Sequence, residues 1–169
     1  MPYARVTVAV VLVAVALALQ VTLFSRLALP GATPDLVLLV VVGLALSQGP
    51  GFGLAVGFGA GLAVDLVPPA DHEVGRWALV LTLVGYGAGL AQAETRRSAF
   101  LPLAVVAAAA AGSVLAYAGL GALLDDDYVT WSAVSALLPT AVLYDVVLSA
   151  FAVPAVIAVA RRTEPDVAR

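Results

Sequence analysis

The chain has 169 residues, of which 63% are hydrophobic and 11% charged, and its mean hydropathy is +1.08. A soluble domain of this length has too little interior for that much apolar surface, so the composition excludes a water-soluble globular protein and predicts a chain solvated mainly by lipid. Cysteine is absent, which excludes disulfides, thiolate metal sites and cysteine nucleophiles. The net charge of −3 says little, because orientation in a membrane depends on where the arginines lie.

Six apolar segments follow one another along the chain, and together they predict a single transmembrane domain over residues 1–169. The second segment is short, although it could begin as early as Leu29 despite Pro30 and Pro34. The sixth apolar run starts at Trp131 and is too long for one upright span, so Pro139 is expected to divide it into an interfacial piece and a last span. The predicted spans cover residues 6–24, 34–48, 52–67, 77–93, 100–124 and 139–160.

The arginines predict the orientation of these spans. With the N-terminus in the cytoplasm, six of the eight arginines fall on the cytoplasmic side, and Arg26 and Arg76 fall outside. This positive-inside bias favours an even number of spans with both termini cytoplasmic. The six cytoplasmic arginines are Arg5, Arg96, Arg97, Arg161, Arg162 and Arg169.

Residues 51–65, GFGLAVGFGAGLAVD, carry the strongest local pattern. Gly53, Gly57 and Gly61 recur every four residues, and Asp65 continues the series, so the four positions form one stripe on a helix. A helix that is apolar all round with a small-residue stripe is typical of close helix packing in a membrane.

Gly85 and Gly89 repeat the pattern in the fourth predicted helix. One interpretation is that the glycines let helices of this chain approach closely. The other is that they receive a helix from a partner protein. Two glycine faces so near in sequence can meet each other, which favours the internal contact for at least one of them.

Asp65 is a candidate functional residue because a carboxylate inside an apolar helix is costly. A negative charge at the C-terminal end of a helix opposes the helix dipole, so capping does not explain it. Three alternatives stay open: an interfacial acid that reaches water, a buried acid that fixes helix register through Arg76, a backbone amide or its own proton, and an ion-binding acid in transport.

Asp145 and Gln20 are the other intramembrane polar candidates. A last span that starts at Pro139 would place Asp145 roughly 9 Å below the outer surface, which favours a structural hydrogen bond or an ion pair over a ligand site. Gln20 is expected to form a hydrogen bond between helices.

The sequence contains no nucleophile–base arrangement, no phosphate-binding loop and no lysine, so neither an enzyme, a metal site nor a cofactor is expected.

An ordered set of short motifs resembles the bacterial rod shape-determining protein MreD family. Residues 57–66, GFGAGLAVDL, are similar to the family's Gly-Phe-x-x-Gly-Leu-x-x-Asp-Leu pattern. The other matching positions are Leu19–Thr22, the PDLV of residues 34–37, Gly75, Ala78, Val84–Tyr86, Pro139, Tyr144 and Asp145.

The resemblance implies a multi-pass protein of the bacterial cytoplasmic membrane that supports side-wall peptidoglycan synthesis and rod cell shape. It implies a non-enzymatic scaffold that binds the single-span protein MreC, and through it a glycosyltransferase and a transpeptidase, with no nucleic-acid partner. It also implies an all-α fold of about six transmembrane helices similar to the substrate-binding subunits of energy-coupling vitamin transporters.

That fold likeness raises a second hypothesis, a transporter subunit that binds a small molecule between its helices. Fold alone does not establish function, and a ligand pocket needs several convergent polar groups. The few candidates favour the scaffold; they are Gln20, Thr22, Asp65, Thr82, Asp145 and Ser149.

Overall fold

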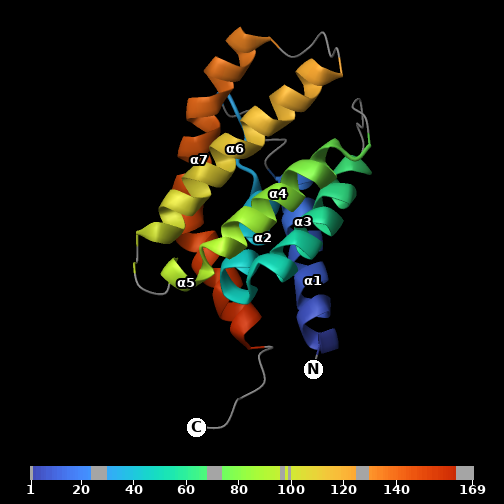
Figure 1. The fold of residues 1–169 in the computed structure, drawn as a ribbon, viewed down its shortest axis with the longest axis vertical. Helices are drawn as coiled ribbons and strands as arrows, with labels where there is room; N and C mark the ends of the chain where they lie inside the picture. The colour runs from blue at the N-terminus through green and yellow to red at the C-terminus, as the bar shows by residue number, and fades with distance from the viewer. Residues whose placement is uncertain are drawn as a thin grey trace.

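The structure is a computed structural model that describes residues 2–23, 30–67, 74–95, 98, 100–124 and 130–162. Within these ranges every regular element is a helix (Figure 1). The elements are α1 (Pro2–Thr22), α2 (Leu36–Gln48), α3 (Pro50–Asp65), α4 (Arg76–Leu90), α5 (Gln92–Thr95), α6 (Leu101–Leu123) and α7 (Trp131–Arg161).

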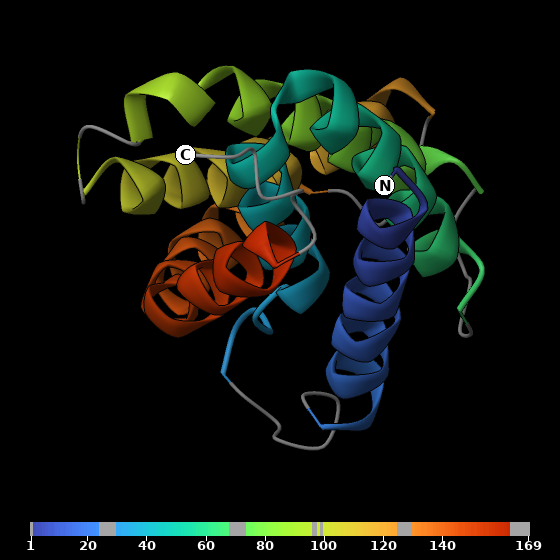
Figure 2. The same cartoon turned by 90° about the horizontal axis from the view of Figure 1, so that it is seen from below.

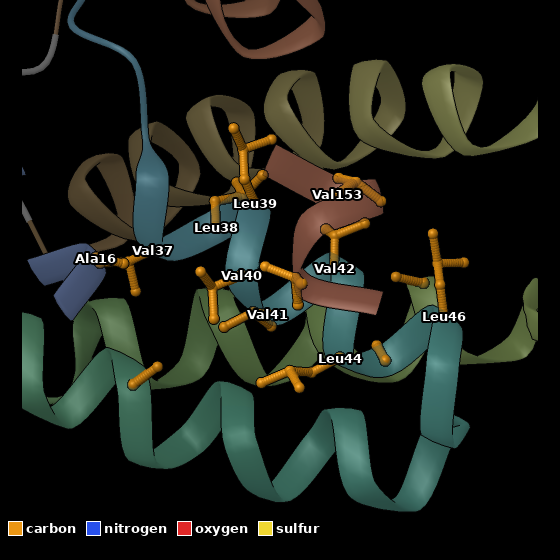
Figure 3. Close-up of a cluster of buried hydrophobic side chains, with 14 of the residues drawn as sticks. Ala16, Val37, Leu38, Leu39, Val40, Val41, Val42, Leu44, Leu46 and Val153 are labelled. Carbon is orange, nitrogen blue, oxygen red and sulfur yellow. The ribbon is translucent and has the colours of Figure 1, made fainter. Parts of the chain in front are cut away.

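Helix α2 forms the centre of the bundle. It contacts α1, α3, α4, α6 and α7, which surround it when the molecule is viewed along the bundle (Figure 2). Every residue from Val37 to Ser47 is buried, and the labelled side chains of α2 point to several sides of the helix (Figure 3). A helix that is apolar all round requires such an environment, because it has no polar face to turn toward water.

The outer helices bury only one side. In α1 the buried residues are Ala9 and Ala16, while Val10, Val11 and Val15 are exposed. An exposed apolar face of this kind suits contact with lipid, where no polar face is needed. Three described helices, α1, α6 and α7, are long and apolar enough to cross a membrane.

The other three apolar helices are short. Helices α2, α3 and α4 have 13, 16 and 15 residues, which corresponds to roughly 20–24 Å of helix against a hydrocarbon core of about 30 Å. The count of six spans therefore stays a prediction. The second helix does not extend back to Leu29, because residues 32–35 are non-helical.

The predicted division at Pro139 is wrong, because α7 is one helix of 31 residues with Pro139 and Pro154 inside it. A proline removes one backbone donor and bends a helix but does not have to end it. Val134 and Ala141 are buried on either side of Pro139, and their spacing of two turns puts them on the same face. Packing of this shared face holds both parts of α7 in one helix.

The start of α1 and the end of α7 lie at the same end of the molecule (Figure 1). Arg5 near the start of α1 and the Arg161–Arg162 pair at the end of α7 therefore share that end, as the positive-inside pattern predicts. Arg26, Arg96, Arg97 and Arg169 lie outside the described residues.

Candidate functional site

Asp65 is at the C-terminal end of α3, and its side chain is fully buried, with 0% exposure. Its Oδ2 accepts hydrogen bonds from the backbone N–H groups of Gly75 at 2.8 Å and Ala78 at 3.1 Å. Its Oδ1 accepts a third from the backbone N–H of Trp77 at 3.1 Å. These donors are the N-cap residue of α4 and two residues of its first turn, where free N–H groups need acceptors.

Capping therefore does explain Asp65, contrary to the expectation based on its own helix. The charge is unfavourable at the end of α3 but favourable at the start of α4, where the helix dipole is positive. Its burial also excludes the interfacial acid that reaches water. The contacts match the alternative in which the acid fixes the register of two helices through backbone amides.

Arg76, the first residue of α4, ties the same helix start to α6. Its Nη2 and Nε donate to the carbonyl oxygen of Tyr117 at 2.8 and 3.2 Å, and its guanidinium carbon lies 3.7 Å from the centre of the Tyr117 ring. The Trp77 ring lies 4.8 Å from the same ring. This cation–π and aromatic contact buries Arg76 without exposing its charge to lipid.

The second buried acid, Asp145, lies in the middle of α7 and is 3% exposed. Its Oδ1 accepts a hydrogen bond from the backbone N–H of Asp35 at 2.7 Å. Asp35 in turn caps α2, because its Oδ1 accepts from the backbone N–H of Leu38 at 2.9 Å. Gln20 of α1 completes the contact, since its Oε1 accepts from the backbone N–H of Val37 at 3.1 Å.

Two further side chains of α7 hold the non-helical residues that precede α2. The Thr140 Oγ1 accepts from the backbone N–H of Ala32 at 3.1 Å, and the Tyr144 hydroxyl donates to the carbonyl oxygen of Pro30 at 3.2 Å. Non-helical backbone inside a membrane protein is tolerated only where protein groups satisfy it. Helix α7 thus supplies the partners that let the chain enter the bundle before α2 begins.

The glycine stripe of α3 faces α4. A Cβ added to Gly53 would collide with the backbone of Gly85, one on Gly57 with that of Leu81, and one on Gly61 with that of Ala78. Gly89 meets the backbone of Pro50 in the same way. The two antiparallel helices are therefore in backbone contact along their length, which places the predicted glycines inside the chain rather than on a partner-facing surface.

Several residues of these contacts were not among the sequence candidates. Asp35 carries a recognisable signal, because Asp directly before an apolar run is a preferred N-cap. Thr140 and the Arg76–Tyr117 contact have no such signal, since the groups they meet are backbone carbonyls and amides far away in the sequence.

The remaining polar candidates bond within their own helices. The hydroxyls of Thr22, Thr82 and Ser149 donate to the carbonyl oxygens of Ala18, Ala78 and Val146. The described residues contain no group of three or more His, Cys, Asp or Glu side chains that could hold a metal ion. Among the described residues, Asp65, Arg76 and Asp145 thus join helices to each other, whereas these three hydroxyls bond within their own helices.

The family model described as rod shape-determining protein MreD matches residues 3–163. The chain belongs to the MreD family. The match covers every described helix except the first residue of α1, so the resemblance seen in the short motifs is confirmed. Membership in the MreD family places the protein in rod-shape determination. Neither a search of curated proteins nor a search of solved structures returned a match, and the likeness to vitamin-transporter subunits stays a prediction.

Proposed function

We propose that this protein is a non-enzymatic membrane scaffold of the cell-wall elongation complex, which supports side-wall peptidoglycan synthesis by binding the helix of an MreC-like single-span protein. The observation that carries the proposal is the filled centre of the bundle. Helix α2 fills the centre of the bundle, and Val37 to Ser47 are all buried there. A protein of the MreD family with its centre filled by its own helix offers its outer faces for recognition.

A groove of about 420 Å³ between α4 and α6 is the surface we propose for the partner helix. Its lining is apolar, and much of it is Gly or Ala. Small residues allow a second helix to approach closely in a membrane. A Cβ added to Gly87 or Gly112 would meet no atom within 4 Å, so these two glycines keep space open that the fold itself does not use.

The test is to fill the groove without disturbing the fold. Gly112→Leu and Gly87→Leu should leave abundance unchanged but abolish co-purification with the single-span partner and complementation of rod shape in a depletion strain. Gly59→Leu is the matched control, because Gly59 is equally open but lies on α3, away from the groove. Normal co-purification in both groove variants would reject this surface.

The proposed orientation has both termini in the cytoplasm. A single cysteine at Asp126 should react with an impermeant thiol reagent in intact cells, and one at Arg162 should not. The native chain has no cysteine that would interfere. The reverse labelling pattern would overturn the orientation.

Transport by a small-molecule-binding subunit remains the alternative proposal, and no contact among the described residues favours it. It requires a polar site for the ligand, whereas the grooves on this bundle have mainly apolar linings. Purified protein that binds a water-soluble vitamin-like ligand would favour this alternative over the scaffold.

A further inference from the structure

A second groove, between the start of α6 and the second half of α7, differs from the first in carrying a charge. It has a volume of about 500 Å³, and apolar residues such as Pro102, Val153 and Ile157 form most of its lining. Arg161 is the one charged side chain among the described residues that line it, and it lies in the last turn of α7.

The length of this groove matches one leaflet of a membrane. Its lining residues on α7 extend from Ser149 to Arg161, which is roughly 18 Å along the helix axis. Half of the hydrocarbon core of a bilayer is about 15 Å thick. The apolar part therefore fits one acyl chain, with Arg161 at the depth of the headgroup.

A small pocket with some polar side chains continues the groove toward the bundle. It has a volume of about 70 Å³, shares Pro102, Ile157 and Arg161 with the groove, and adds Leu46, Ser47 and Thr95. This is room for several water molecules or for one compact polar group. The hydroxyls of Ser47 and Thr95 already donate to the carbonyl oxygens of Leu44 and Gln92, so their oxygens remain as acceptors.

We propose that the groove between α6 and α7 binds one anionic phospholipid from the leaflet that contains Arg161. The acyl chain lies along α7, Arg161 binds the phosphate, and the oxygens of Ser47 and Thr95 accept hydrogen bonds from headgroup hydroxyls. The charge of Arg161 favours a phospholipid over a helix as the occupant of this groove. The groove between α4 and α6 has no charged residue in its lining and suits a helix, whereas an arginine at the end of an apolar groove complements a phosphate joined to a hydrocarbon chain.

The proposal is tested on the full-length protein, purified in detergent and stripped of lipid. Phosphatidylglycerol or phosphatidylcholine with identical acyl chains is added, and bound lipid is counted by native mass spectrometry. Wild type should bind phosphatidylglycerol about five-fold more tightly, the effect expected for one arginine near a headgroup. Arg161→Gln should remove this preference, and Arg162→Gln, which changes a neighbouring arginine outside the groove lining, should keep it.

The apolar part is tested separately. Ala158→Phe fills the groove and should weaken binding of both lipids, while Ala155→Phe, at another exposed alanine of α7 that is outside the lining, should not. If Ala158→Phe does not purify as a single species, Ala150→Phe, at another exposed lining residue, replaces it.

Equal effects of the two arginine changes, or unchanged lipid binding after the groove is filled, would overturn the proposal. The assay contains no partner protein, so its outcome is independent of the proposed scaffold function.

Discussion

The starts of α2 and α4 solve the same problem in different ways. Each helix start has N–H groups that need acceptors, and each receives a buried carboxylate from another helix. At α4 the acceptor is Asp65, which binds three amides that follow it by only 10 to 13 residues. At α2 it is Asp145, which binds one amide 110 residues away.

The difference shows that a helix start can be satisfied either by one acceptor close in sequence or by several acceptors far apart in sequence. One carboxylate with both oxygens in use is enough at α4, because a short connection brings α3 and α4 together. The start of α2 is distributed over Gln20, Asp35 and Asp145, so three separate segments must meet there. We expect the start of α4 to depend on one residue and the start of α2 to tolerate single changes better.

The largest expected effect is that of Asp65→Leu. It removes the acceptor of three N–H groups, of which the one of Ala78 is buried and those of Gly75 and Trp77 are partly buried. The cost is about 1–3 kcal/mol for each buried group left without an acceptor, so the variant should not accumulate as folded protein. Abundance in membranes and the unfolding temperature in detergent measure this. A variant as stable as wild type would show that the amides find other acceptors.

Gly57→Leu disturbs the packing between α3 and α4. The added side chain meets the backbone of Leu81, which cannot move without separating α3 from α4, and overpacking costs about 1–3 kcal/mol or more. Lower abundance is expected. Gly59→Leu on the open face of α3 serves as the control and should behave as wild type; equal losses in both would point to helix propensity rather than contact.

Asp145→Leu should lower the free energy of unfolding by about 1–3 kcal/mol, because one amide loses its acceptor. This is a smaller loss than that expected for Asp65→Leu. Hydrogen exchange measured on peptides should speed up around residues 32–38 and stay unchanged around residues 75–78. Faster exchange at both helix starts would mean that they are coupled and would remove the contrast between them.

The two Asn substitutions sharpen the contrast. Asp145→Asn keeps one carbonyl oxygen for the Asp35 amide and should be active and nearly as stable as wild type. In Asp65→Asn one oxygen must serve three amides, and the new NH₂ group faces at least one buried donor, at a cost of about 1–3 kcal/mol. Thermal unfolding and rod-shape complementation measure both. Two equally inactive but stable Asn variants would favour an ion-binding role for the charge.

Tyr144→Phe should have the smallest effect, about 0.5–1 kcal/mol, because it removes one neutral hydrogen bond to the carbonyl oxygen of Pro30. A small fall in unfolding temperature with normal cell shape is expected. A loss as large as that of Asp145→Leu would mean that the Tyr144 hydroxyl anchors the chain before α2 as strongly as the Asp145 carboxylate does.

The contrast also explains what could be predicted from the sequence. The apolar segments, the glycine stripe and the two buried acids can be recognised in the sequence, because polar and small residues stand out in an otherwise apolar chain. The hydrogen-bond partners of Asp65 and Asp145 cannot be recognised, because they are backbone amides, which nearly every residue has. The sequence also does not predict that α7 continues through Pro139. Packing of Val134 and Ala141, which are buried on either side, outweighs the tendency of proline to end a helix.

The distance in sequence between Asp35 and Asp145 has a consequence for biosynthesis. At roughly 5–20 residues per second, the ribosome needs roughly 5–20 s to make the 110 residues that separate the amide from its acceptor. During that interval the shortest apolar helix, which has no polar face of its own, waits in the membrane without its final partner. A nascent chain that stops before α7 is therefore a natural substrate for membrane chaperones and quality-control proteases.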